Sequence, residues 1–259
     1  MMLEVNNLEF SYKNHRVLNG IDFSAESGMC ICLLGENGAG KTTLFRCLLG
    51  LLRDYKGSIH IGGADARRLS VSETAKKIAY IPQAHEPTFN YTVFETVLMG
   101  TNILINRLSS PGNHEHDIVL DMLELMGIGH LADRGYAEIS GGERQLALIA
   151  RALAQKSRIL IMDEPTANLD YGNQFRVMMQ VKKLAEKGYL VILSTHNPEH
   201  ALLFADKVLV IKSGRTEIFG EPGYALSPDM IQNIYGISVE MQTFKTKNGD
   251  VPMVVPQFS

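Results

Sequence analysis

The sequence is short of cysteine and has no tryptophan: three cysteines occur among 259 residues. An odd number of cysteines without framework spacing argues against a disulfide scaffold. Cys30 and Cys32 lie two apart on an expected strand, so their side chains share one face. Without nearby histidines, a metal site of thiols is disfavoured. We expect all three, Cys47 included, to be buried as small apolar residues.

Long apolar runs and an excess of positive charge are also missing. The apolar runs at 159–162 and 208–211 have the length of buried strands and are far too short to span a membrane. Residues 1–10 include Glu4 and Glu9 and lack the apolar region of a secretory signal, so none is expected. The net charge is −3, and no binding to nucleic acid is expected. At a membrane, a partner would have to supply the spanning segment.

The apolar pattern predicts an α/β protein. Alternation over residues 3–23 favours a short antiparallel sheet, with turns expected at Asn6-Asn7, Lys13-Asn14 and Asn19-Gly20. Apolar strands at 29–34, 78–81, 159–162, 189–193 and 207–211 are separated by helical patterns, which is typical of a parallel sheet covered by helices. The first such helix starts at Lys41 and is expected to bury Leu44, Cys47, Leu48 and Leu51 on one face.

Two segments depart from this alternation. Residues 92–135 have helical spacing without a strand signal, which predicts a helical insertion. Residues 227–259 predict one helix followed by two short strands around the turn at 247–250. We therefore expect a main domain at 1–225 with a helical subdomain at about 90–140, and a C-terminal extension at 226–259.

A glycine-rich loop follows the first apolar strand. Residues 35–42 read Gly-Glu-Asn-Gly-Ala-Gly-Lys-Thr and match G-x-x-x-x-G-K-[ST] without a mismatch. Glycines let backbone N–H groups converge on phosphate oxygens, Lys41 can reach the phosphates as a point charge, and Thr42 can offer a hydroxyl to Mg²⁺. A chance match in a turn is the alternative, and the flanking strand and helix disfavour it.

Two acids end another buried strand. Asp163 and Glu164 follow the apolar run at 159–162, at the carboxyl edge where open α/β sheets bind ligands. Asp163 would hold Mg²⁺, and Glu164 would orient or deprotonate an attacking water. A solvated acidic turn is the alternative reading, which the phosphate loop on the same sheet makes weaker. Together the two motifs predict a P-loop NTPase core with a mostly parallel sheet.

A third segment narrows the class. Residues 139–145, Ile-Ser-Gly-Gly-Glu-Arg-Gln, resemble the signature sequence of the ABC ATPase family, usually read as L-S-G-G-Q. Other family elements lie around it in the family's order: an aromatic for adenine (Tyr12), the phosphate loop, the Q-loop glutamine (Gln83), the Walker B strand, the D-loop (167–170) and the switch histidine (His196). The resemblance covers about residues 1 to 220.

The resemblance implies ATP and Mg²⁺ as cofactors and assigns roles to individual residues. The catalytic set is Glu164, His196, Gln83 and Lys41. The metal set is Thr42, Gln83 and Asp163. The nucleotide-binding set is Tyr12, Gly35, Asn37, Gly38, Gly40, Lys41, Thr42, Thr43, Ser140, Gly141, Gly142 and Glu143. For Tyr12 the alternative is core packing, and for His196 a structural histidine.

The signature also has a physical reading. Ser140, Gly141 and Gly142 precede a helical stretch, and such a helix N-terminus attracts anions. In the family, the signature of one subunit covers the γ-phosphate held by the other, so the resemblance implies a homodimer with two ATP molecules between its halves. A simple capped helix start would explain the serine but not the two glycines.

The sequence departs from the family pattern at four places. Ile139 replaces leucine, Asn168 replaces a small residue, and Asn197 replaces a common acid after the histidine. Glu143 replaces glutamine, which removes an amide donor and adds a charge. Because the phosphate-contacting positions are unchanged, we expect activity to be retained.

The resemblance is closest to importer ATPases. Residues 89–100, 139–155 and 228–256 are similar to ATPases that serve iron-chelate, haem and vitamin B12 importers, and to relatives that move molybdate or tungstate. This implies transmembrane permease subunits, an external substrate-binding protein and a location at the cytoplasmic face of the cell membrane. The segment from His85 to Tyr91 is expected to contact the permease. The alternative function is a soluble ATP-driven switch acting on nucleic acid or a protein assembly.

Overall fold

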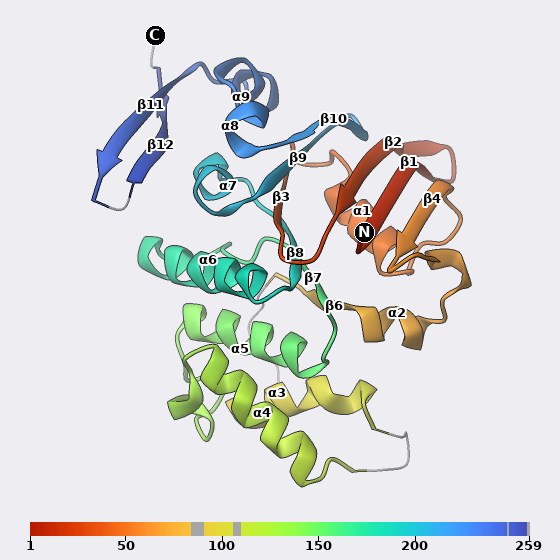
Figure 1. Cartoon of the computed structure of the whole chain (residues 1–259), viewed down its shortest axis with the longest axis vertical. Helices are drawn as coiled ribbons and strands as arrows, with labels where there is room; N and C mark the ends of the chain where they lie inside the picture. Colours follow the sequence, from red (N-terminus) through yellow and green to blue (C-terminus); the bar gives the residue numbers. More distant parts are fainter. Residues whose placement is uncertain (84–90, 106–109, 248, 258–259) are drawn as a thin grey trace.

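The computed structural model describes residues 1–83, 91–105, 110–247 and 249–257. Its centre is a six-stranded sheet in the order β10-β9-β3-β8-β7-β6 (Figure 1). The strands are β3 (Cys30–Leu34), β6 (Ile78–Ile81), β7 (Ile159–Met162), β8 (Leu190–Ser194), β9 (Lys207–Lys212) and β10 (Arg215–Gly220). Only β10 runs antiparallel to its neighbour. The carboxyl ends of the five parallel strands therefore meet at one edge, where the predicted site residues follow them.

The N-terminal residues form a separate antiparallel sheet in the order β2-β1-β4-β5. Its strands are β1 (Leu3–Tyr12), β2 (His15–Ala25), β4 (Lys56–Ile61) and β5 (Ala64–Asp65). Two of the three predicted turns are wrong. Asn6-Asn7 lies inside β1 at a register shift where Asn7 has φ 44°, and Asn19-Gly20 lies inside β2. Asparagine and glycine tolerate positive φ, so they accommodate an irregular strand as readily as a turn.

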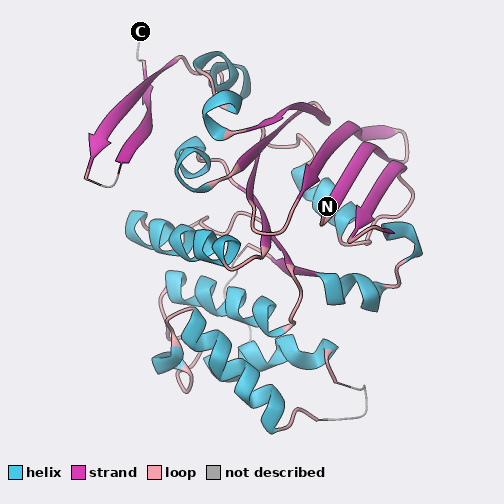
Figure 2. Ribbon diagram, viewed as in Figure 1, coloured by secondary structure: helices cyan, strands magenta, loops and turns pink. Residues whose placement is uncertain are grey.

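Helices cover the central sheet on both faces (Figure 2). They are α1 (Lys41–Leu48), α2 (Val71–Lys77), α5 (Gly141–Ala154), α6 (Tyr171–Glu186) and α7 (Pro198–Phe204), with a 3₁₀ turn η1 (Ala66–Arg68) before α2. Cys30 and Cys32 face a core shared with α5 and α6. Ile31 and Leu33 face the core shared with α1 and the N-terminal sheet.

The cysteine prediction is confirmed, because all three thiols are buried and free. One helix prediction is wrong. The helix α1 ends at Leu48, and Leu51, expected on its buried face, is 64% exposed. The chain turns at Gly50, which has φ 69°, so helical periodicity no longer applies beyond it.

The helical insertion is confirmed. It consists of α3 (Val93–Leu98), the 3₁₀ turn η2 (Met99–Ile103), α4 (Asn113–Leu125) and the 3₁₀ turn η3 (Gly129–Leu131). An isolated bridge between Thr92 and Gly135 closes its base. Its apolar residues, Val97 and Leu123 among them, pack in one core with α5.

The C-terminal residues form α8 (Pro222–Ala225), α9 (Pro228–Tyr235) and a hairpin of β11 (Val239–Thr246) and β12 (Gly249–Pro256). The helix and two strands were predicted, whereas α8 and the edge strand β10 were not. The predicted division of the chain at residue 225 stays a prediction.

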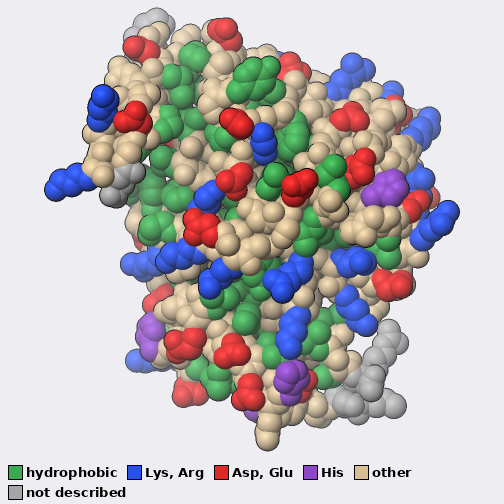
Figure 3. All heavy atoms as spheres, in the orientation of Figure 1, with side chains coloured by type: hydrophobic (Ala, Val, Ile, Leu, Met, Phe, Trp, Pro, Cys, Tyr) green, Lys and Arg blue, Asp and Glu red, His purple; other side chains and the backbone are tan. Residues whose placement is uncertain are grey.

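Among the described residues, no helix is long and apolar enough to cross a membrane. Acidic and basic side chains are interspersed on the face in Figure 3.

Candidate functional site

The glycine-rich loop joins β3 to α1 at the carboxyl edge of the sheet. A Cβ on Gly35 would lie 2.3 Å from the carbonyl oxygen of Ile211, and one on Gly40 would lie 2.8 Å from Leu18 Cδ2. Both positions also have positive φ, 153° and 106°, so they require glycine. By contrast, a Cβ on Gly38 would meet nothing within 4 Å. The loop is thus packed at its two ends and open in its middle, where a ligand can approach the backbone.

Lys41, the first residue of α1, lies in this loop. Its Nζ donates hydrogen bonds to the carbonyl oxygens of Gly35 at 2.7 Å and Glu36 at 3.1 Å. Burial lowers the pKa of the ammonium group, and the carboxylates of Glu164 and Asp163 oppose that effect. The charge of Lys41 is therefore held close to two acids that come from a different strand.

The loop borders a hollow of about 270 Å³. Its lining consists mostly of residues predicted to bind phosphate, together with one acid: Val17, Asn37, Gly38, Gly40, Lys41, Thr42, Thr43 and Glu164. The structure thus brings the phosphate loop and the carboxylate of Glu164 to one space, as the sequence predicted. Thr42 is exposed at this space, and Thr43 is buried.

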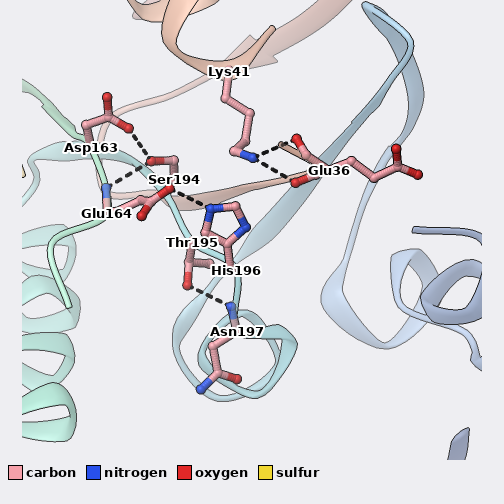
Figure 4. Close-up of polar contacts among 9 residues, drawn as sticks. Glu36, Lys41, Asp163, Glu164, Ser194, Thr195, His196 and Asn197 are labelled. Carbon is pink, nitrogen blue, oxygen red and sulfur yellow. Dashed lines mark hydrogen bonds and ion pairs between the residues drawn. The ribbon is translucent and has the colours of Figure 1, made fainter. Parts of the chain in front are cut away.

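Asp163 and Glu164 are held by a serine from the neighbouring strand (Figure 4). Ser194 ends β8, is fully buried, and donates from Oγ to Asp163 Oδ1 at 2.7 Å. The same Oγ accepts from the backbone N–H of Glu164 at 2.9 Å. Glu164 itself has φ 49°, a conformation that is uncommon outside glycine. Ser194 therefore fixes the directions in which both acids leave the strand.

Tyr80 is a second residue that forms a hydrogen bond with Asp163, and sequence analysis did not identify it as a site residue. Its hydroxyl donates to Asp163 Oδ2 at 3.3 Å. Burial, together with the neighbouring Asp163 carboxylate, raises the pKa of Tyr80 to about 12. The phenol therefore stays protonated and remains a donor over the physiological range. Both carboxylate oxygens of Asp163 thus have a donor from a flanking strand.

His196 lies on the other side of Glu164. Its Nε2 is 2.6 Å from Glu164 Oε1. A second hollow, of about 390 Å³, adjoins this pair. Residues from the segment around the D-loop, from α6, from the switch segment and from α7 line it with Glu164: Thr166, Ala167, Gln174, Thr195, His196, Asn197, Pro198 and His200. Glu164 thus borders both hollows, with the phosphate loop on one side and the histidine on the other.

Gln83 follows β6 at the same edge and is half-buried. The strand before it is fixed to the acids, because Asp163 N donates to the carbonyl oxygen of Ile81 at 2.9 Å.

Tyr12 ends β1 and is 39% exposed, with its ring 4.9 Å from that of Phe10. It does not line either hollow. Of the segment from His85 to Tyr91 that is predicted to contact a permease, residues 85–90 lie outside the described residues.

The signature residues lie at the start of α5 and form a capping box. Ser140 is the N-cap: its Oγ accepts from Glu143 N at 3.3 Å, while Glu143 Oε2 accepts from Ser140 N at 2.8 Å. The Ser140 hydroxyl also donates to Glu143 Oε2 at 2.7 Å, and this bond, together with the one from Ser140 N, lowers the pKa of Glu143. Gly142 presses against α6, since a Cβ there would lie 2.5 Å from Asn173 Oδ1. None of these residues lines the two hollows around Glu164.

The arrangement supplies what phosphate chemistry requires. The open loop, the start of α1 and Lys41 can hold phosphate oxygens, and Glu164 can orient a water between the two hollows. No group of three or more His, Cys, Asp or Glu among the described residues could hold a metal alone.

Comparison with known proteins identifies the family. Residues 18–167 match the family model described as ABC transporter. An uncharacterized ABC transporter ATP-binding protein of Haemophilus influenzae is 39% identical over 93% of this chain and 92% of its own length. The molybdate import ATP-binding protein MolC of the same organism is 31% identical over 99% of this chain and 96% of its own length.

Solved structures agree with the sequence comparison. A chain of a transporter assigned to the metal-chelate type, solved in an inward-facing conformation, superposes with a TM-score of 0.88 at 30% identity. The match covers 99% of this chain and 98% of the other. The chain therefore belongs to the ABC transporter family and is an ATP-binding cassette that hydrolyses ATP.

Proposed function

We propose that this chain is the ATP-hydrolysing subunit of an importer and that Glu164 is its catalytic base. The observation that carries the proposal is the position of Glu164. Its carboxylate borders the hollow of the phosphate loop and also lies 2.6 Å from His196. A carboxylate between the phosphates and a histidine is suited to orient water for attack on the γ-phosphate.

The other site residues bind ATP and stabilise the charge that develops during hydrolysis. The backbone of residues 35–40 and the start of α1 bind the phosphates of ATP, with Asn37, Thr42 and Thr43 at the same hollow. Lys41 leaves its loop carbonyls and turns to the β and γ phosphates, where it stabilises charge in the transition state. His196 and Gln83 position the water or the γ-phosphate. Tyr12 stacks on adenine.

Thr42, Asp163 and Gln83 would hold Mg²⁺. Their fit rests on their oxygens, because a hydroxyl, a carboxylate and an amide oxygen at one sheet edge are the hard ligands that this cation prefers. When bound, Mg²⁺ neutralises part of the charge of the β and γ phosphates. The contribution of this chain is to orient Asp163 through Ser194 and Tyr80.

The signature residues require a second copy. Ser140, Gly141, Gly142 and Glu143 form an anion-attracting helix N-terminus, yet they line neither hollow around Glu164. In a head-to-tail homodimer, the signature of each copy covers the ATP held by the other. Because ATP then contacts both halves, it favours the closed pair, and hydrolysis removes that preference.

The transport role rests on the relatives. Two of the matches above are named for molybdate import and for metal-chelate transport, and these names support an importer of a metal chelate, cobalamin, haem or an oxyanion. Separate permease subunits would span the membrane, with this chain on their cytoplasmic face, and an external substrate-binding protein would deliver the cargo.

Glu164→Gln tests the catalytic proposal. The amide keeps the shape but cannot accept a proton, so ATP turnover should fall about 10²- to 10⁴-fold while ATP binding persists. The variant should also accumulate as a dimer in ATP, measured by light scattering. Glu186→Gln, an exposed acid at the end of α6, is the matched control and should behave as wild type. Near-normal turnover by Glu164→Gln would remove Glu164 from this role.

Affinity capture from detergent-solubilised membranes tests the transport proposal. The tagged full chain should recover a polytopic membrane protein in stoichiometric amount, identified by mass spectrometry. Exclusively soluble partners, or nucleotide-dependent binding to DNA at moderate salt, would replace the importer by a soluble ATP-driven switch. The ATPase chemistry would be unaffected by that outcome.

A further inference from the structure

The helix α7 begins at Pro198, two residues after His196, and its start fixes where that histidine lies. Asn197 is its N-cap, with Oδ1 accepting from Glu199 N at 2.9 Å. The backbone N–H of Asn197 donates to Thr195 Oγ1 at 3.1 Å. His196 therefore lies between the end of β8 and the first turn of α7. Any displacement of α7 should be transmitted to the contact between His196 and Glu164.

A helix of seven residues is too short to be stable alone, so packing must hold α7. On one side it meets α6, where the ring of Phe175 lies 5.8 Å from that of His200 and 5.9 Å from that of Phe204. On another side it meets strand β12 of the C-terminal hairpin (Figure 1). The hairpin thus contacts the helix that follows the switch histidine, although the two are about fifty residues apart in sequence.

The hairpin has two unlike faces. On the inner face, Met241 and Val254 are paired across the strands and pack on the core cluster that contains Ala201 of α7. On the outer face, Gln242 and Met253 are paired and exposed. A two-stranded hairpin is marginal by itself in water. Its inner face therefore holds the hairpin in place and braces α7 at the same time.

We propose that the C-terminal hairpin positions His196 for ATP hydrolysis by bracing α7, with Met241 and Val254 as the positioning residues. The proposal rests on the role of His196 proposed above. Neither residue touches the nucleotide site. They act on the reaction through the geometry of His196 and Glu164, where a small misplacement lowers turnover strongly.

The kinetic test compares the two faces in the full chain. Val254→Asp places a charge in the contact with the core and should lower kcat about tenfold or more, with KM for ATP unchanged because the phosphate loop is untouched. Met253→Asp places the same charge on the outer face of the same strand and should stay within about twofold of wild type. Val254→Ala, a milder change, should lower kcat in the same direction if Val254→Asp does not fold.

A second readout separates positioning from general damage. In ¹⁵N-histidine spectra of the full chain, the imidazole resonances of His196, assigned with His196→Gln, report the contact with Glu164. The Val254 variants should shift these resonances, and Met253→Asp should leave them unchanged. An unchanged kcat in the Val254 variants, or a lowered kcat with unshifted His196 resonances, would overturn the proposal.

The two proposals fail differently. If His196→Gln keeps wild-type turnover, the proposed catalytic role of His196 is wrong. The decrease in kcat expected for the Val254 variants is then no longer expected either. A shift of the His196 resonances in the Val254 variants would then still establish that the hairpin braces α7. If His196→Gln loses turnover and the Val254 variants match Met253→Asp in both readouts, the bracing is wrong and the catalytic role stands.

Discussion

Ser194 Oγ donates to Asp163 Oδ1 at 2.7 Å, which joins the ends of two neighbouring parallel strands at the nucleotide edge. The register makes this contact possible, because Met162 lies opposite Leu193. Asp163 follows Met162 and Ser194 follows Leu193, so these two residues also lie side by side. Since Ser194 also accepts from Glu164 N at 2.9 Å, one buried hydroxyl orients the metal-ligand candidate and the catalytic candidate together.

Ser194→Ala should therefore impair hydrolysis more than folding. The change leaves the backbone N–H of Glu164 without its acceptor and Asp163 Oδ1 without its donor. An unsatisfied buried group costs about 1–3 kcal/mol, and loss of that amount in the transition state alone corresponds to a roughly 5- to 150-fold decrease in kcat. Turnover at saturating Mg-ATP measures the effect, and a fluorescent ATP analogue measures binding separately.

Ser157→Ala is the matched control. Ser157 is also fully buried, but its Oγ has no hydrogen-bond partner among the described residues. Removing an unpaired buried hydroxyl should leave stability unchanged or raise it slightly, with normal turnover. Equal losses of turnover in Ser157→Ala and Ser194→Ala would contradict the orienting role of Ser194.

Tyr80→Phe should have a smaller effect than Ser194→Ala. The Tyr80 hydroxyl is 3.3 Å from Asp163 Oδ2, longer than the 2.7 Å of the serine bond, and the ring is 38% exposed, so water can replace the donor. We expect kcat to fall by less than about threefold, because a net hydrogen bond of this kind contributes about 0.5 kcal/mol. A loss as large as that of Ser194→Ala would show that Tyr80 is the main support of Asp163.

Much of the site could be predicted because its chemistry follows local motifs. The phosphate loop and the Asp163–Glu164 pair each lie in a few consecutive residues. Ser194 was missed because its role depends on the register of two strands about thirty residues apart. The capping box of Ser140 and Glu143 did have a sequence signal, S-x-x-E before an apolar helix. These two residues were instead interpreted as phosphate-binding, because they lie in a segment that resembles the family signature.

The fold shows the same division between local and distant information. Continuous apolar runs predicted the buried parallel strands, since such strands are covered on both faces. Strand β10 was missed because it lies at the sheet edge, where its residues are exposed or half-buried and do not form the continuous apolar run of a buried strand. The irregularity at Asn7 was taken for a turn because positive φ occurs in both settings.

Glu143 should make stability depend on pH at the start of α5. Its folded pKa is lowered by the hydrogen bonds of Ser140, so its contribution is present above the unfolded pKa and is lost as pH falls through the folded pKa. A carboxylate near a helix N-terminus contributes about 0.3–1 kcal/mol. Wild type should exceed Glu143→Gln in unfolding free energy by about that amount at neutral pH.

Denaturant unfolding at a series of pH values checks this prediction. The difference between wild type and Glu143→Gln should shrink below about pH 4, where the carboxyl group protonates. Glu138→Gln, at an exposed acid two residues before the capping box, is the control because it removes a carboxylate and leaves the cap intact. A difference between wild type and Glu143→Gln that stays constant through the acid range would mean that the charge of Glu143 does not stabilise the helix.

Gly142→Ala should destabilise the chain through a single neighbour. The new Cβ would lie 2.5 Å from Asn173 Oδ1 and 2.9 Å from Asn173 Cβ, so α5 and α6 must separate at this point. Overpacking of this kind costs about 1–3 kcal/mol. Gly141→Ala is the control, because its Cβ would lie 3.3 Å from only the end of Leu169, where the leucine can move.

A double-mutant cycle identifies the source of the strain. Asn173→Gly removes the atoms that the new Cβ meets, so Gly142→Ala should cost less in that background by at least about 1 kcal/mol, measured by denaturant unfolding. Gly141→Ala should show no coupling with Asn173→Gly, because its neighbour is different. If Gly142→Ala is as stable as Gly141→Ala, packing against Asn173 does not require the second glycine of the signature, and that result would favour a requirement imposed by the ATP of the second copy in the proposed dimer.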